Sequence, residues 1–159
     1  MENIYGPNFD LKKISAADKK KYMKNTLTEF PAVASIILHI VTLGIFTMIY
    51  YGIKHGQLPK ITEDDPSAGK AIGFLFIPFF NFYWIFKFWI RLVDRVNVQL
   101  KLRNMEEVPR GLAITIPILK IVNIIPVINY MTFFANHFVI IPITLALLQS
   151  SINKLAGGK

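Results

Sequence analysis

The chain has 159 residues, of which 53% are hydrophobic and 18% are charged, and its length suits a single domain. An ordinary globular protein has about 25% charged residues, so this composition favours a chain embedded in lipid. Cysteine is absent, which excludes disulfides, thiolate metal sites, iron–sulfur clusters and cysteine nucleophiles. The net charge of +8 has to be interpreted from where the basic residues lie.

Residues 1–30 form a polar, basic segment that precedes the first apolar stretch. Its basic residues are Lys12, Lys13, Lys19, Lys20, Lys21 and Lys24. Ser15-Ala-Ala-Asp18 resembles a helix capping box with Asp in place of Glu, and apolar residues as far as Phe30 follow at helical spacing. We expect a short interfacial helix on the inner leaflet, with its three consecutive lysines on lipid headgroups.

Two apolar stretches follow, at residues 31–53 and 71–90. The first has 23 residues without a formal charge, and about 20 are enough to cross the hydrocarbon core as a helix. The second is interrupted only by Lys87 and continues as residues 91–103, where Leu92 and Val96 belong to an apolar stripe. We therefore predict two spans, the second with a cytoplasmic amphipathic extension.

Two further apolar stretches lie at residues 112–128 and 133–148. The former is only 17 residues long and contains Lys120 and two prolines, so it either spans fully or is tilted or re-entrant. The latter is interrupted by Asn136 and His137. The predicted fold is thus an all-α, polytopic membrane protein in which residues 31–159 form a domain of about four transmembrane helices.

The distribution of basic residues predicts the orientation, because short loops rich in Lys and Arg stay on the cytoplasmic side. Most of the eighteen basic residues become cytoplasmic when the N-terminus and the C-terminus are both inside. A basic inner face attracts the anionic lipids of that leaflet, which explains the positive charge without nucleic acid. We predict a multi-pass inner-membrane protein with Lys87, Arg91 and Arg95 as further headgroup contacts.

Ionisable groups inside the predicted spans are few. All ten acidic residues lie outside them, so the spans contain no carboxylate relay of the kind that proton pumps use. Lys120 lies about 12 Å into the third span at 1.5 Å per residue. Either the segment tilts and Lys120 reaches the surface, or it meets an anion or a partner subunit. The candidate contact residues are Lys120, Asn123, Asn81 and Asn129.

Two histidines, His39 and His137, raise the possibility of a bis-histidine haem. Their positions in the first and fourth spans predict different depths, which argues against one iron between them. No phosphate-binding glycine loop, zinc spacing or nucleophile elbow is present in the sequence. We therefore predict no cofactor, no metal and no catalytic residues.

A short pattern around proline occurs twice. Ile77-Pro-Phe-Phe-Asn-Phe-Tyr83 is loosely repeated as Ile125-Pro-Val-Ile-Asn-Tyr130. Proline inside a helix releases the carbonyl four residues earlier, and that carbonyl must find another partner or line a wet cavity. The repeat hints at a duplicated hairpin.

Three segments carry a resemblance to a known family. They are Thr42-Leu-Gly-Ile-Phe-Thr-Met-Ile-Tyr-Tyr51, Ile77-Pro-Phe-Phe-Asn-Phe-Tyr-Trp-Ile-Phe-Lys87 and Arg91-Leu-Val-Asp-Arg-Val-Asn97. Together they resemble the DUF4234 group of small prokaryotic membrane proteins, over roughly residues 30–104. The resemblance implies a bacterial or archaeal inner-membrane protein, and it implies no activity and no site residues.

Two functional hypotheses follow. The first is a non-enzymatic accessory or scaffolding subunit of a larger membrane assembly, bound to other membrane subunits or to itself. The second is a small homo-oligomeric transporter or channel. Because Lys120 has no acidic residue in its span, the transported species would be an anion.

Overall fold

The computed structural model describes residues 14–157, and among them it contains helices and no β-strand. The all-α class predicted from the sequence is confirmed. The elements are α1 (Ala16–Met23), α2 (Ala32–Val41), α3 (Ile45–Gln57), α4 (Ala68–Gly73), the 3₁₀ helix η2 (Phe74–Phe76), α5 (Phe80–Leu102), α6 (Gly111–Val122), α7 (Pro126–Ala135), the π-helical η3 (Asn136–Ile140) and α8 (Ile141–Gly157). Residues 1–13, with Lys12 and Lys13, and residues 158–159 lie outside the described part.

The first predicted span, residues 31–53, is not one helix but a helical hairpin. α2 ends with a Schellman motif, in which the N–H of Leu43 donates to the carbonyl of Ile40 and the N–H of Gly44 donates to that of His39. Leu43 and Gly44 have φ values of 51° and 86°, in the left-handed region that glycine adopts without strain. The chain reverses there, and α3 returns beside α2.

The second predicted span, residues 71–90, also reverses in its middle. Ile77 has φ −82° and ψ 114°, the extended conformation imposed on a residue before proline. Phe79 has φ 60° and precedes the first residue of α5. The prediction of a single helix over this stretch is therefore wrong, because Pro78 ends the helical run that begins in α4.

The third predicted span, residues 112–128, breaks in the same manner. Ile125 has φ −79° and ψ 112°, and Pro126 occupies the first turn of α7, where its missing N–H is harmless. The Ile-Pro pattern repeated in the sequence thus marks two helix reversals of similar backbone conformation. The hinted duplication corresponds to these two turns.

The fourth predicted span lies within a longer helical segment. α7, η3 and α8 run continuously from Pro126 to Gly157, and within residues 14–157 this is the one helix long and apolar enough to cross a membrane. The π-helical turn of η3 precedes Pro142, which has no N–H to donate to the carbonyl of Phe138. This irregular turn accommodates the proline without ending the helix.

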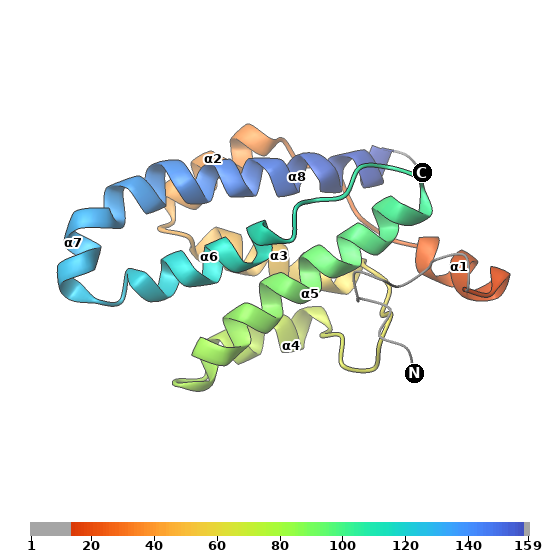
Figure 1. Cartoon of the computed structure of the whole chain (residues 1–159), viewed down its shortest axis with the longest axis horizontal. Coiled ribbons are helices and arrows are strands. Elements are labelled where there is room, and N and C mark those ends of the chain that lie inside the picture. The colour runs from red at the N-terminus through yellow and green to blue at the C-terminus, as the bar shows by residue number, and fades with distance from the viewer. Residues whose placement is uncertain (1–13, 158–159) are drawn as a thin grey trace.

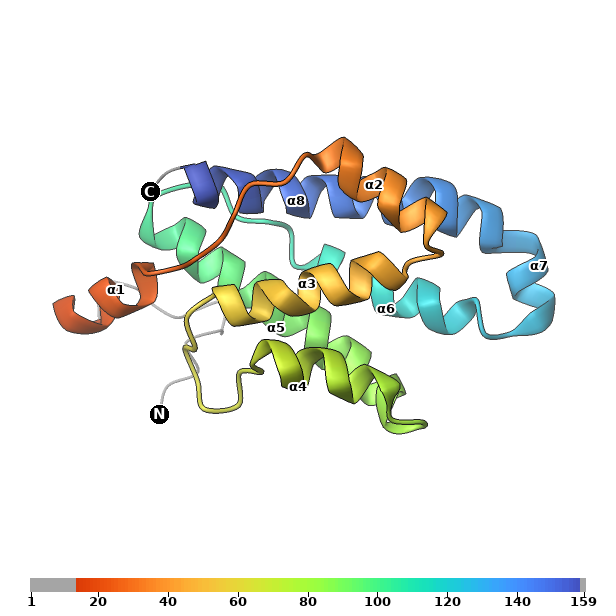
Figure 2. The same ribbon diagram turned by 180° about the vertical axis from the view of Figure 1, so that it is seen from behind.

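The three reversals gather at one end of the molecule, which we call the turn end (residues 42–44, 77–79 and 123–125). The polar connectors, residues 58–67 and 103–110, lie toward the opposite end together with the end of α8, and we call this the connector end (Figure 2). The alternating topology predicted above placed these two connectors on opposite sides of the membrane. In the structure they lie toward the same end, because each apolar stretch before them turns back.

α3 and α4 pack closely against each other. Gly52 and Gly56 lie one turn apart on α3, and a Cβ on Gly52 would lie 2.3 Å from the Ile72 Cγ1. A Cβ on Gly56 would lie 3.0 Å from that of Ala68. Two small residues at this spacing let helix backbones approach closely, so the glycines allow the second hairpin to pack against the first, as Figure 2 shows from behind the view of Figure 1.

α5 forms the centre of the fold. It runs without a break to Leu102, so the predicted helical extension is present, but residues 92–100 are buried on every side. The expectation of an amphipathic surface helix there is wrong. α1, α3, α6 and α8 surround α5, and they cover the polar positions as well as the apolar stripe that begins at Leu92 and Val96.

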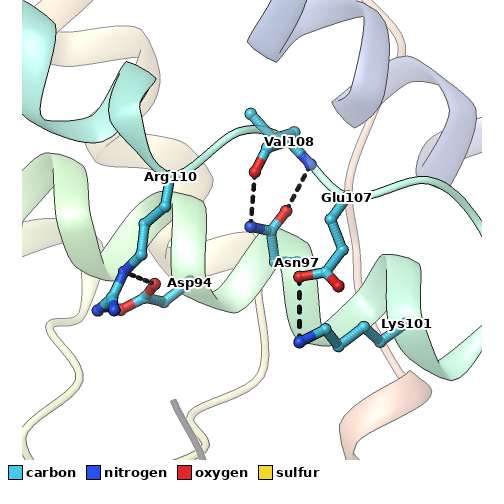
Figure 3. A network of polar contacts seen from close by, with 6 residues as sticks. All are labelled: Asp94, Asn97, Lys101, Glu107, Val108 and Arg110. Atoms are coloured by element: carbon cyan, nitrogen blue, oxygen red, sulfur yellow. Dashed lines mark hydrogen bonds and ion pairs between the residues drawn. The ribbon is translucent and has the colours of Figure 1, made fainter. Parts of the chain in front are cut away.

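Polar side chains on one face of α5 hold the connector of residues 103–110. Asp94 pairs with Arg110 at 3.0 Å, Lys101 pairs with Glu107 at 3.1 Å, and the amide of Asn97 makes two hydrogen bonds to the backbone of Val108 (Figure 3). The three positions on α5 follow a helical spacing of three and four residues, so they share one face.

Candidate functional site

A cavity of about 320 Å³ lies near the turn end, where α5, α6, α7 and η3 meet. Its polar lining residues are Asn81, Lys120, Asn123 and His137, and its apolar ones are Leu43, Met48, Phe82, Ile85, Ile121, Ile124, Phe133 and Ile141. Three of the contact residues proposed from the sequence therefore meet at one site. The fourth, Asn129, is on α7 and does not line this cavity. We call this cavity of about 320 Å³ the turn-end cavity.

Lys120 stands in the last turn of α6 and is partly buried. Its ammonium lies close to the turn between α2 and α3, since a Cβ on Gly44 would be 3.2 Å from the Lys120 Nζ. Within residues 14–157 no hydrogen bond or ion pair to this side chain is present. The acidic residues that the structure describes lie in α1, between α1 and α2, or toward the connector end.

His39 and His137 lie side by side, with ring centroids 4.7 Å apart. The prediction that their depths differ is wrong, because α2 ends at the turn end and His39 thereby faces η3. The rings contact each other directly, so no haem fits between them. In the described part of the chain, no group of three or more His, Asp or Glu side chains suits a metal ion.

The hydrogen bonds of this histidine pair are incomplete. The His39 Nδ1 is 2.7 Å from the Thr47 Oγ1, and the Nε2 of the same ring is buried without a partner among the described residues. The His137 Nε2 is 3.4 Å from the carbonyl oxygen of Ile40. The pair therefore connects the first hairpin to η3.

The asparagines differ in their contacts. Asn123 accepts a hydrogen bond of 2.9 Å from the Asn136 amide, which ties the third turn to η3. The Oδ1 atoms of Asn81 and Asn129 are buried and have no partner among residues 14–157. These two asparagines hold equivalent places after the two Ile-Pro turns, and each backbone N–H donates to the isoleucine before the proline.

The lysines of α1 and the basic residues of α5 were predicted to contact lipid headgroups. Lys19, Lys20 and Lys21 are exposed on α1, which begins with the predicted Ser15 cap. The helix ends at Met23 instead of continuing toward Phe30. Buried Leu27 lies beyond it, so the predicted apolar face is only partly helical.

Lys87 and Arg91 line a second hollow of about 440 Å³ on α5, together with Asp94 and Arg110. Burial raises the pKa of the Asp94 carboxyl, while the nearby Arg110 guanidinium opposes that change. Basic and acidic groups are thus mixed in this hollow. Because its basic groups have an acidic partner, this hollow is better suited to a structural role than to binding an anion, in contrast to the turn-end cavity.

Arg95 is not a headgroup contact, because its side chain is fully buried. Its guanidinium donates to the carbonyls of His55, Leu58, Pro59 and Pro66, and it lies 3.2 Å from the His55 Nδ1. These bonds hold the connector of residues 58–67 against α5. Sequence reasoning placed Arg95 at the membrane surface because the charge follows an apolar run.

The Thr47 contact and the pairing of the two histidines were not predicted from the sequence. The available signal was Leu43-Gly44, since glycine after an apolar helical run is typical of a helix C-terminus. A helix that ends there brings His39 to the turn end.

Comparison of the chain with family models, curated proteins and solved structures gives no significant match. The resemblance to the DUF4234 group therefore stays a prediction. The segments that carry it have structural roles in this fold: two contain hairpin turns, and the third contains Asp94, Arg95 and Asn97, which hold the two connectors.

Proposed function

We propose that this chain is a non-enzymatic inner-membrane protein that inserts its turn end into the bilayer from the cytoplasmic side. In that position it acts as an accessory or scaffolding subunit of a membrane assembly. The observation that carries the proposal is the separation of an apolar turn end from a charged connector end within one helical fold.

Exposed apolar side chains support insertion at the turn end. Phe79 is 87% exposed, Phe76 and Val127 are 74% exposed, and Leu43 is 68% exposed. A monomeric soluble protein rarely exposes a large contiguous apolar patch. Lipid contact removes the free-energy cost of leaving these side chains in water.

α2, α3 and α6 are too short to cross the bilayer and favour insertion without alternate crossings, whereas the continuous helix Pro126–Gly157 is long enough to cross. α2, α3 and α6 have 10, 13 and 12 residues, which correspond to about 15–20 Å at 1.5 Å per residue. The hydrocarbon core is about 30 Å thick. Arms of this length enter the bilayer and return, so the two connectors would stay on the cytoplasmic side.

α7 supports the proposed role as a subunit. None of its residues is buried in the chain itself, and Val127, Tyr130, Met131 and Phe134 are between 72% and 94% exposed. Their spacing is that of one helix face. A helix of another subunit, or of a second copy, would cover this face, which we call the α7 stripe.

Single-cysteine labelling tests the insertion, since the chain contains no cysteine of its own. Lys60→Cys and Glu106→Cys place exposed thiols in the two connectors. In spheroplasts, an impermeant maleimide should label neither thiol before lysis and both after it. Labelling of one variant in intact spheroplasts and of the other only after lysis would restore the alternating topology.

Extraction in mild detergent tests the subunit role. We expect a particle with other subunits, or further copies, in constant ratio, and Tyr130→Lys on the α7 stripe should release the chain from it. Val33→Lys is a matched control, since Val33 is also exposed but lies on α2. A lone monomer in the wild-type extract would contradict the proposal.

The turn-end cavity favours a second candidate function, transport of an anion by a homo-oligomer. Broken helices that surround polar side chains near mid-membrane are typical of secondary transporters. Liposomes that contain only this protein should then pass anions, and Lys120→Leu should abolish the flux. Absence of wild-type flux would leave the subunit role as the better proposal.

A further inference from the structure

The turn-end cavity combines an apolar wall with a small number of polar groups. Asn81, Lys120, Asn123 and His137 come from three separate parts of the chain and converge on it, and the rest of its lining is apolar. Small-molecule sites in proteins have this character, with few polar groups that orient a mostly apolar ligand.

The charge of the cavity is unbalanced. Lys120 brings one ammonium group, and no carboxylate lines the cavity among the residues that the structure describes. A buried or lipid-facing ammonium without a counter-charge is costly. A ligand with one negative charge would remove this imbalance, whereas a neutral ligand would leave it in place.

The amides add hydrogen-bonding capacity beside the lysine. The Asn81 side chain lines the cavity, and its Oδ1 has no partner in the described part of the chain. The NH₂ group of the same side chain can donate a hydrogen bond to an anion in the cavity. The Asn123 amide is already bonded to Asn136 and is therefore held in place.

The volume of the cavity indicates the size of ligand that it can enclose. At about 30 Å³ for each atom of water-like size, a volume of about 320 Å³ holds roughly ten non-hydrogen atoms. Octanoate has a carboxylate head and a saturated tail and matches that size. Phe82, Ile85 and Phe133 offer apolar contacts for such a tail.

We propose that the turn-end cavity binds an amphiphilic carboxylate of medium chain length, with its head on Lys120 and Asn81 and its tail along the apolar wall. This inference goes beyond the proposed function. Binding is measured on the purified full chain in a non-ionic detergent, so its result is independent of membrane topology and of partner subunits.

The test is a titration with carboxyl-labelled ¹³C octanoate, followed by the carbon chemical shift, with octanol as the neutral probe of equal length. We expect saturable binding of octanoate, and binding of octanol at least tenfold weaker. Lys120→Met, which keeps the stem and removes the charge, should weaken octanoate binding at least tenfold. Lys87→Met is the matched control on α5 and should change it less than twofold.

A second variant addresses the case in which Lys120→Met does not fold. Ile124 lines the cavity and is 58% exposed, so Ile124→Trp should fill the cavity while the ammonium stays. It should also weaken octanoate binding at least tenfold. Equal binding of octanol and octanoate by the wild-type chain, or unchanged octanoate binding in a folded Lys120→Met or Ile124→Trp variant, would overturn the proposal.

Discussion

Replacement of Arg95 tests the account of the connector end most directly. The guanidinium donates to four backbone carbonyls, at 3.1 Å for Pro59, 3.3 Å for Pro66 and 2.9 Å for His55, with Leu58 as the fourth. Arg95→Met keeps much of the side-chain volume and removes every one of these donors. The carbonyls at the end of α3 and in the connector of residues 58–67 would then lose a buried partner.

The expected loss follows from the cost of unsatisfied buried groups. Each buried carbonyl without a partner costs about 1–3 kcal/mol, and partial entry of water reduces the sum. Removal of one partner from a buried charged network typically costs about 3–5 kcal/mol. We therefore expect Arg95→Met to lower the free energy of unfolding by about 3–5 kcal/mol and to loosen the connector.

Two measurements check this prediction. Unfolding in mixed micelles, followed by helical circular dichroism, gives the change in free energy, and trypsin cleavage after Lys60 reports on the connector. Lys87→Met is the control, because Lys87 is only partly buried and lies over the Trp84 ring at 5.8 Å, a contact of about 0.5–1 kcal/mol. A loss below about 1 kcal/mol for Arg95→Met, with unchanged cleavage, would refute the reasoning.

Three further predictions concern packing, pH and the second connector. Gly52→Ala should lower the free energy of unfolding by about 1–3 kcal/mol, since the new Cβ would lie 2.3 Å from a side chain of α4. Gly69→Ala is the control and should not lower it, because the space around Gly69 is open. Equal effects of the two substitutions in thermal unfolding would contradict the prediction. Burial, and next the Arg95 charge, lower the pKa of His55 to about 3, so the folded state keeps the ring neutral. The contribution of His55 to the free energy of unfolding is complete above the unfolded pKa of about 6.5. It falls as the pH drops toward 3, by at most about 1.4 kcal/mol per pH unit. If His55→Gln shows the same dependence of stability on pH, His55 is not the group responsible. Asn97→Leu should lower the free energy of unfolding by about 1–3 kcal/mol. It should also speed hydrogen exchange at the Val108 N–H, which donates to the Asn97 side chain. Unchanged exchange at Val108 would show that this bond does not hold the connector.

The sequence by itself determined the helical class, and it carries local signals for several helix boundaries, of which the prediction used only Ser15. Ser15 at the start of α1, Gly44 before α3 and Pro126 in the first turn of α7 are local signals, and each acts through the backbone within a few residues. The long apolar stretches also follow from composition alone. These features need no knowledge of what packs against them.

Only the tertiary structure decided the direction of each apolar stretch. A run of 23 uncharged residues satisfies a crossing helix and a short hairpin equally well, because hydropathy measures composition and not the path of the chain. The same reversals bring His39 beside His137 and carry Lys120 to a shared cavity. Arg95 is likewise buried and holds the connector of residues 58–67, because that connector folds back over α5. Contacts between residues so far apart in sequence depend on tertiary packing, which no local sequence pattern predicts.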